Sequence, residues 1–308
     1  MSPDRVTSDP APARLSVGVV SAGRVGTALG EALERVGHVV FGCAAVSDAS
    51  RRRAETRLPD AEIMPATDVA RRSELLILAV PDQELDALVR GLARTDAVSP
   101  GTLVLHTSGA NGVGILAPLA GRGVVTMAVH PAMTFSGKPE DTDRLATACF
   151  GITAADEIGL AIAQGLVLEI GGEPVGVPEE ARTLYHAALA HGSNHLITLV
   201  VDALDALRDA LAHEELPGQQ PVEQRPGGVA ERVLAPLLSA ALDNVLRSGQ
   251  GALTGPVARG DGATVSRHLD ALTDLDPRIA AGYRAMSLRT AERAGADDTV
   301  MNVLRDNE

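Results

Sequence analysis

Residues 15–30, LSVGVVSAGRVGTALG, decide the fold of the first half of this 308-residue chain. The apolar run at their start predicts a buried strand, and apolar side chains at helical spacing follow as far as Val36. The turn between strand and helix resembles the G-x-G-x-x-G turn that binds dinucleotides, with Ser21 in the first glycine position. The alternative is a tight turn that binds no ligand. The candidate contacts to a pyrophosphate at this helix N-terminus are Ser21, Gly23, Arg24, Val25 and Gly26.

Strand-like and helix-like segments alternate as far as residue 178. Continuous apolar strands separated by helices are typical of a parallel sheet covered on both faces. We therefore predict an α/β domain over residues 14–178, with a Rossmann-like, doubly wound and mostly parallel sheet. The polar, proline-rich residues 1–13 are expected to be a disordered tail. Strands are expected at residues 15–20, 39–46, 75–80, 102–106, 124–129, 150–153 and 174–177.

The pattern becomes helical after Pro178. Residues 179–213 read as one long helix and residues 229–247 as another, with a kink or restart at Pro236. Further helices are expected from about Thr264 and Pro277, and residues 214–228 read as a mobile Pro/Gly-rich loop. Residues 179–308 are therefore predicted to form an all-helical domain for substrate binding and dimerisation.

Composition excludes several classes of function. The net charge is -13 and aromatic residues make up 2%, which removes the basis for phosphate-backbone binding and for base stacking. No apolar run approaches the roughly 18 residues of a membrane span, and the N-terminal stretch lacks the apolar centre of a signal peptide. The two cysteines, Cys43 and Cys149, are expected to be reduced. We expect a cytoplasmic protein with no nucleic-acid or membrane partner.

The end of the second strand predicts which dinucleotide binds. NAD-binding domains place an acidic residue there for the ribose hydroxyl, whereas this chain has Ser47 followed by arginines. We predict NADP(H), with its 2′-phosphate held by Ser47 and by Arg51 or Arg52. Asp48 comes one position late and is a candidate helix cap. A solvated basic patch is the alternative.

Six segments together resemble one bacterial family of Rossmann-like oxidoreductases with a C-terminal helical domain of unknown function. They are LSVGVVSAGRVGTALG, LLILAVPDQEL, VLHTSGANG, VHPAMTF, TLYHAALAHGSNHL and ALTGPVARGDGATVSRHL. The family is distantly similar to pyrroline-5-carboxylate reductases, F420-dependent NADP oxidoreductases and ketopantoate reductases. The resemblance implies hydride transfer with NADPH at a cleft between the domains. It also implies a homodimer in which the helical domains pack together.

Polar residues follow three of the predicted strands, where ligands of doubly wound sheets bind. Val80, Pro81 and Asp82 are expected to line the cofactor near its ribose, with Asp82 also capping the next helix. His106 ends another strand and is a candidate cofactor contact, and Ser108 or its neighbour Thr107 is a candidate for the nicotinamide or the substrate. His130 follows a third. The alternative for both histidines is a buried structural role.

His186 is the best candidate for the proton donor of a ketone reduction, because imidazole titrates near neutral pH. Asn194 lies eight residues along the same predicted helix and completes the candidate pair. The alternative for His186 is a packing role. His191 and His195 have the spacing of helical metal ligands, but no third ligand is apparent, so we expect no metal site.

Arg259, in a glycine-flanked loop, is the candidate that holds a substrate carboxylate. A pair between Arg259 and Asp261 in a rigid connector is the alternative. The leading hypothesis is thus an NADPH-dependent reductase of a small 2-oxo acid, with ketopantoate as the first candidate. The alternatives are an imine reductase of the pyrroline-5-carboxylate type and a non-catalytic NADP-binding regulatory protein.

Overall fold

The computed structural model describes residues 14–121, 123–212 and 228–305. The chain divides into two compact units, Met1–Ala190 and His191–Glu308. The predicted tail over residues 1–13 lies outside the described residues, and so do residues 214–227 of the predicted loop 214–228.

The first unit is built on an eight-stranded sheet with the order β3-β2-β1-β4-β5-β6-β7-β8. Every strand pair is parallel except β6 with β7, so the predicted Rossmann-like and mostly parallel sheet is confirmed. β3 was not anticipated from the sequence, since two residues are too short to show a period. The strands are β1 (Ser16–Val20), β2 (Val39–Ala44), β3 (Glu62–Ile63), β4 (Leu75–Leu78), β5 (Leu103–His106), β6 (Val125–Pro131), β7 (Cys149–Ala154) and β8 (Glu173–Gly176).

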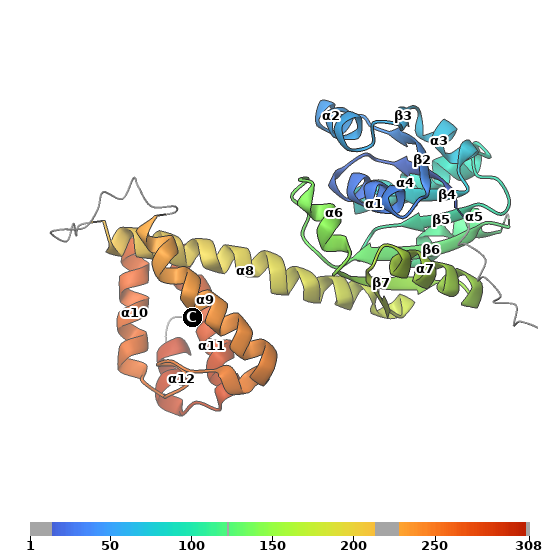
Figure 1. Cartoon of the computed structure of the whole chain (residues 1–308). Coiled ribbons are helices and arrows are strands. Elements are labelled where there is room, and N and C mark those ends of the chain that lie inside the picture. The colour runs from blue at the N-terminus through green and yellow to red at the C-terminus, as the bar shows by residue number, and fades with distance from the viewer. Residues whose placement is uncertain (1–13, 122, 213–227, 306–308) are drawn as a thin grey trace, which may run out of the picture. The chain divides into compact units, whose positions relative to one another are not determined.

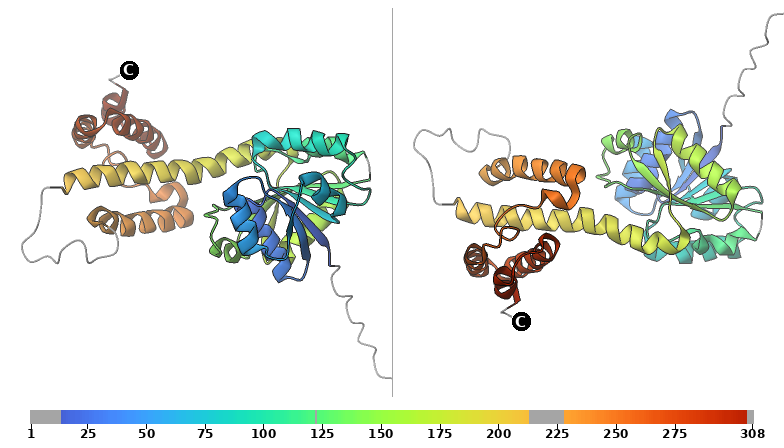
Figure 2. Two further views of the ribbon diagram at one scale, coloured as in Figure 1. Left: turned by 90° about the horizontal axis from the view of Figure 1, so that it is seen from above. Right: turned by 90° about the horizontal axis from the view of Figure 1, so that it is seen from below.

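Strand β4 shows why the sheet is covered on both faces. All four of its residues are buried; Leu75 and Ile77 enter one core, while Leu76 and Leu78 enter the other. Successive side chains of a strand point to opposite faces, so an unbroken apolar run requires helices on both sides (Figures 1 and 2). The first core includes residues of α1 (Arg24–Arg35), α6 (Glu140–Leu145) and α7 (Glu157–Glu169). The second includes α3 (Ala66–Arg72), α4 (Asp82–Arg94) and α5 (Ala117–Ala120).

Two helix caps differ from expectation. Ser47, not Asp48, caps α2 (Asp48–Arg57), because its hydroxyl accepts from the Ser50 amide while its backbone is extended. Asp82 does not cap α4. Pro81 occupies the cap position, and Asp82 is the first helical residue, where a carboxylate still interacts favourably with the positive end of the helix.

The first compact unit extends to Ala190, and the domain boundary at residue 178 stays a prediction. The sheet does end there, and η2 (Glu179–Ala181) then leads into α8 (Arg182–Ala210). Arg182, the first residue of α8, is buried and hydrogen-bonded to β6 and β7, which ties the start of this helix to the sheet.

The second unit is helical among its described residues, as the sequence predicts. α8 continues into it, and α9 runs beside that part of α8 (Figure 2), with an ion pair between Arg208 and Glu231. Pro236 lies inside α9 without ending or restarting it, contrary to one of the two expectations for this residue. The further elements are α9 (Val229–Ser248), η4 (Gly249–Ala252), α10 (Gly262–Leu275), α11 (Pro277–Ala294) and α12 (Asp298–Arg305).

A small apolar core joins the last three helices of the second unit. Its buried members are Val257, Val265, Leu269, Ala291, Val300 and Leu304. By contrast, α8 and α9 each have a single buried residue, although they carry many apolar side chains. Within the described part of the chain, no helix combines the length and apolar character needed to cross a membrane.

The close packing of α1 on β1 depends on Gly26. A Cβ atom at this position would lie 2.2 Å from the carbonyl oxygen of Ser21 and 3.0 Å from a methyl group of Val19. Backbone cannot move aside as a flexible side chain can, so the helix would have to shift away from the strand.

We predict that Gly26→Ala lowers the free energy of unfolding by ~1–3 kcal/mol, the usual cost of overpacking. The matched control is Gly91→Ala in α4, where an added Cβ meets nothing within 4 Å. That substitution is expected to be stabilising by up to ~1 kcal/mol, because alanine is favoured over glycine in a helix. Chemical denaturation of both variants measures the difference, and equal stabilities would contradict the close packing at Gly26.

Candidate functional site

The turn between β1 and α1 leaves polar backbone groups available for an anion. Gly23 is the N-cap of α1 and no side chain caps this helix, so the first amides of its N-terminal turn have no intrahelical partner. A Cβ at Gly23 would approach only the hydroxyl oxygen of Ser21, at 3.4 Å, which leaves the turn open on its outer side. Ser21 adopts a φ of 78°, the left-handed conformation that the usual glycine provides. The residues present therefore fit a pyrophosphate.

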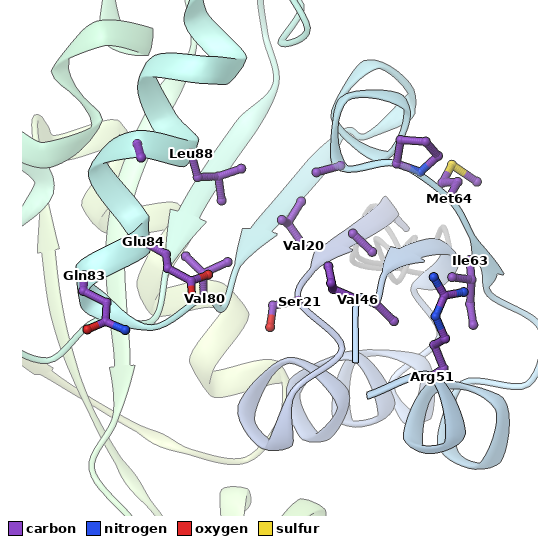
Figure 3. Close-up of a pocket in the computed structure, with 15 residues that line it drawn as sticks. Val20, Ser21, Val46, Arg51, Ile63, Met64, Val80, Gln83, Glu84 and Leu88 are labelled. Atoms are coloured by element: carbon purple, nitrogen blue, oxygen red, sulfur yellow. The ribbon is translucent and has the colours of Figure 1, made fainter. Parts of the chain in front are cut away.

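A groove of about 830 Å³ adjoins this turn at the carboxyl ends of the strands. Figure 3 shows Arg51 extending from α2 near Val46 and Ile63, with Gln83 and Glu84 of α4 across the groove. Val46 is 93% exposed, so it offers an apolar surface with no partner of its own in the described chain. The lining residues are Val20, Ser21, Ala44, Ala45, Val46, Arg51, Ile63, Met64, Pro65, Ala66, Val80, Gln83, Glu84, Ala87 and Leu88.

The arginines after β2 have different surroundings. Arg51 lines the groove, and its guanidinium has no ion pair or hydrogen bond among the described residues. Arg52 is exposed but does not line the groove. Arg53 Nη1 donates to the Ala22 carbonyl oxygen at 3.4 Å, so this side chain supports the turn. The Ser47 hydroxyl caps α2 and is partly occupied there. Arg51 is thus the best placed of these residues for a 2′-phosphate.

The residues after β4 reach the groove only in part. Val80 lines it, whereas Pro81 and Asp82 stand next to it at the start of α4. Sequence reasoning missed Gln83 and Glu84, which do line the groove. Their position in the first turn of the helix that follows a central strand was the available signal.

His106 is fully buried at the end of β5 and holds its own loop. Its Nε2 lies 2.9 Å from the Gly112 carbonyl oxygen, and its Nδ1 accepts from the Ser108 amide at 3.2 Å. Burial lowers the pKa of His106 to about 4, so the ring is neutral at neutral pH, with Nε2 as the donor. Both nitrogens are engaged by the loop. This geometry favours the structural alternative for His106, which would shape a cofactor site without touching the cofactor.

The same loop presents Ser108, and the segment that follows it is tied to η2 just before α8. The Ser108 hydroxyl accepts from the backbone and side-chain nitrogens of Asn111, which leaves its own hydrogen free to donate. The Glu179 carboxylate accepts from the amides of Val113 and Gly114 at 2.7 and 2.9 Å. Sequence reasoning missed Asn111 and Glu179.

Two imidazoles converge on Gly109 in this loop, and the phenol of Tyr185 contacts one of them. The His130 and His186 rings are 6.1 Å apart between centroids, and the Tyr185 hydroxyl oxygen lies 3.0 Å from His130 Nδ1. A Cβ on Gly109 would lie 2.8 Å from His186 Cδ2 and 2.9 Å from His130 Nε2. Only glycine lets both rings approach this closely. Ser108 and His186, both predicted from the sequence, are therefore near one cluster, while Gly109 was missed.

Arg182 lies buried beneath this cluster. It donates to Thr153 Oγ1 at 2.7 Å and to the carbonyl oxygens of Ala128 and Gly151 at 3.1 Å, and no carboxylate pairs with it in the described chain. Burial lowers its pKa, and its Nη1 has no partner among the described residues. Burial, followed by the electrostatic effects of His186 and Arg182, lowers the pKa of His130 to about 4. His130 is therefore neutral at neutral pH.

Asn194 and Arg259 belong to the second unit. Both side chains are exposed there, and the Ser193 hydroxyl donates to Asn194 Oδ1. Asp261 is engaged as the N-cap of α10, accepting from the Thr264 amide, and forms no ion pair with Arg259 within 4 Å. Their roles in a site with residues of the first unit stay predictions.

His191 and His195 face each other on α8, with their Nδ1 atoms 2.8 Å apart. Among the residues that the structure describes, no group of three or more His, Cys, Asp or Glu side chains could hold a metal ion.

Two family profiles match the chain. Residues 1–131 match a Rossmann-like domain, and residues 148–290 match a domain of unknown function, DUF2520. The chain thus combines a Rossmann-like domain with a DUF2520 domain, in agreement with the resemblance inferred from the six motifs. No curated protein matches it.

Several solved structures share the fold. A candidate NADP oxidoreductase from Bacteroides fragilis is 20% identical with a TM-score of 0.74, covering 91% of this chain and 98% of the other. A reductive aminase from Aspergillus terreus, in complex with NADPH and ethyl-5-oxohexanoate, is 17% identical with a TM-score of 0.64, covering 96% and 99%. An imine reductase from Myxococcus stipitatus, in complex with NADP+, is 16% identical with a TM-score of 0.60, covering 93% and 98%. At these identities the likeness establishes the fold.

Proposed function

We propose that this protein is an NADPH-dependent oxidoreductase. The observation that carries the proposal is the uncapped N-terminus of α1, which adjoins a groove where the Arg51 guanidinium lacks a partner among the described residues. The neighbours in complex with NADPH or NADP+ support it. When bound, NADPH supplies a hydride. The turn at Ser21–Gly26 would hold the pyrophosphate, and Arg51 would hold the 2′-phosphate.

We predict that the protein binds NADPH more tightly than NADH and that Arg51→Ala removes the preference. One lost charge-assisted contact of ~1.5–3 kcal/mol weakens NADPH binding roughly tenfold to more than a hundredfold. NADH binding should change little. The matched control is Arg52→Ala, which removes an exposed arginine outside the groove.

Fluorescence titration of both cofactors against the three proteins measures these constants. Equal affinities of the unmodified protein for NADPH and NADH would contradict the proposal that Arg51 holds the 2′-phosphate. A larger loss of NADPH affinity in Arg52→Ala than in Arg51→Ala would assign the 2′-phosphate contact to Arg52 instead.

His186 is the proposed proton donor. Its imidazole is partly exposed beside Gly109, and no described residue hydrogen-bonds to its ring nitrogens. Imidazole exchanges protons near neutral pH, as the reduction of a carbonyl requires.

We expect His186→Ala to lower kcat by about 10²–10⁴-fold, the usual contribution of a general acid, with little change in NADPH affinity. His191→Ala, an exposed histidine on the same helix, serves as the control. Steady-state kinetics and a cofactor titration on each variant provide the comparison. Near-normal turnover in His186→Ala would assign this residue to packing, and a wild-type protein that binds NADPH without turnover would favour the regulatory alternative.

The finer part of the proposal is the substrate, a small 2-oxo acid such as ketopantoate. Its carboxylate would need a cationic partner, and the exposed Arg259 in its glycine-flanked loop offers a planar fork. An imine is the second candidate, because the structural neighbours include imine-reducing enzymes. A screen of NADPH oxidation over 2-oxo acids and cyclic imines separates the two classes.

For a 2-oxo acid, Arg259→Lys should raise KM roughly tenfold or more, since lysine cannot reproduce two parallel hydrogen bonds. The NADPH constant should stay nearly unchanged. KM values from initial rates test this, with the melting temperature as a check on folding. A lower melting temperature with an unaltered KM would make Arg259 a structural residue.

A homodimer through the helical domain is part of the proposal. The α8 and α9 helices expose many large apolar side chains, which a second copy could remove from water. They include Leu196, Ile197, Leu199, Val201, Val233, Leu237, Leu242, Val245 and Leu246. Sedimentation equilibrium measures the mass, and a monomer at micromolar concentration would count against the dimer. Free Cys43 and Cys149 accord with the proposed cytoplasmic location, which cell fractionation tests.

A further inference from the structure

His130 is a half-buried histidine with one engaged and one open ring nitrogen, and the proposed function gives it no task. Its Nδ1 lies 3.0 Å from the Tyr185 hydroxyl oxygen, whereas its Nε2 has no hydrogen-bond partner among the described residues. In that part of the chain, the one side-chain nitrogen or oxygen that is both fully buried and unpartnered is Arg182 Nη1. The open Nε2 of His130 therefore keeps contact with solvent, beside Gly109 and His186.

The pairing with Tyr185 favours one tautomer of His130. Burial raises the pKa of Tyr185, so the phenol keeps its proton at neutral pH. A half-buried hydroxyl proton needs an acceptor, and His130 Nδ1 is the acceptor within reach. Nδ1 then carries no hydrogen of its own, and the neutral ring carries it on Nε2. The groups that act electrostatically on the ring are His186, Arg182, Asp82 and His106.

Resting on the proposed function, we propose that His130 is a second catalytic residue, whose Nε2–H donates a hydrogen bond to the carbonyl oxygen of the substrate. Tyr185 is its positioning residue. His130 and His186 then divide the work: His130 polarises the carbonyl, and His186 delivers the proton. Gly109 is the residue whose missing side chain lets the two rings address one atom.

The proposed step reduces the carbonyl by adding one hydride, which carries two electrons, and one proton. When bound, NADPH would supply the hydride from a C–H bond of its nicotinamide and would be oxidised to NADP+. The hydride would form the new bond to the carbonyl carbon, the π electrons of the C=O bond would move to the oxygen, and the oxygen would take a proton from the His186 imidazolium, which would become neutral imidazole. His130 neither gains nor loses a proton. Negative charge grows on the oxygen during the step, so a fixed donor stabilises the transition state more than the bound ketone.

The charge around the cluster favours a carbonyl over an iminium substrate. Arg182 is a buried guanidinium without a carboxylate partner in the described chain, and its positive field acts on His130. Such a field stabilises a developing oxyanion and opposes a preformed cation. A ketone or aldehyde is therefore the substrate class that this cluster fits.

The first experiment reads the tautomer without any turnover. Nitrogen-15 NMR of the histidine-labelled full chain distinguishes Nδ1–H from Nε2–H rings, and loss of the signal in His130→Gln assigns it. We expect a neutral Nε2–H ring at pH 7 in the unmodified protein and a mixture of tautomers in Tyr185→Phe, which lacks only the hydroxyl. An Nδ1–H ring in the unmodified protein, or no change in Tyr185→Phe, would overturn the positioning role.

The second experiment compares His130→Leu with His130→Gln. Leucine removes the donor, so kcat should fall about 10²–10³-fold, as for the loss of one oxyanion donor. Glutamine keeps an amide donor near the Nε2 position and should retain more of the rate. NADPH affinity and the melting temperature should stay close to those of the unmodified protein in both variants.

The outcomes separate the two proposals. If the unmodified protein does not oxidise NADPH with any carbonyl substrate, both the proposed function and the role of His130 are contradicted. Turnover in the unmodified protein together with unchanged kcat in His130→Leu would contradict the role of His130 alone. Equal losses in His130→Leu and His130→Gln, with lowered melting temperatures, would reduce His130 to a packing residue.

Discussion

A buried arginine holds the first turns of α8 to the sheet, and the candidate site depends on it. Arg182 is 1% exposed and donates to one side chain and two carbonyl oxygens on β6 and β7. A buried cation without a carboxylate is costly, and such a group is tolerated only where it makes several hydrogen bonds. In return it fixes the backbone that carries Tyr185 and His186. Its positive charge also adds to burial, the larger effect, in lowering the pKa of His130.

The parallel sheet provides the other half of the site. Parallel strands end at a common edge, so the residues after β1, β4, β5 and β6 are brought together although they lie far apart in sequence. The turn after β1 supplies free amides, the loop after β5 supplies Ser108 and Gly109, and β6 supplies His130.

The fold followed from the sequence because its signals are local. The β1 turn and the four buried residues of β4 show their pattern within a few positions. The unbroken apolar run of β4 also predicts that helices cover both faces of the sheet. The caps at Ser47 and Pro81 were each misjudged by one position. Ser47 and Asp48 are both good N-cap residues and compete, whereas α4 begins one residue earlier than a cap at Asp82 requires. β3 could not be predicted, because its two residues are too few to show a period.

The candidate site was predicted residue by residue but not as a constellation. His130 and His186 stood out as polar residues in apolar surroundings, yet nothing in their spacing indicates that they meet over Gly109. That contact depends on Arg182 and on the antiparallel pairing of β6 with β7. His106 and His130 look alike in sequence. They differ in the structure because the loop after β5 folds back to engage both nitrogens of His106, whereas His130 keeps one open.

The central claim is that NADPH binds along the strand ends and meets the cluster of His130, Tyr185 and His186. A crystal structure of the full chain with NADP+ tests it most directly. The account predicts the pyrophosphate against the first amides of α1, the 2′-phosphate on Arg51, and the nicotinamide ring beside Gly109 with both histidines facing the same side. A dinucleotide whose nicotinamide lies away from Gly109, or one that avoids the groove altogether, would contradict it.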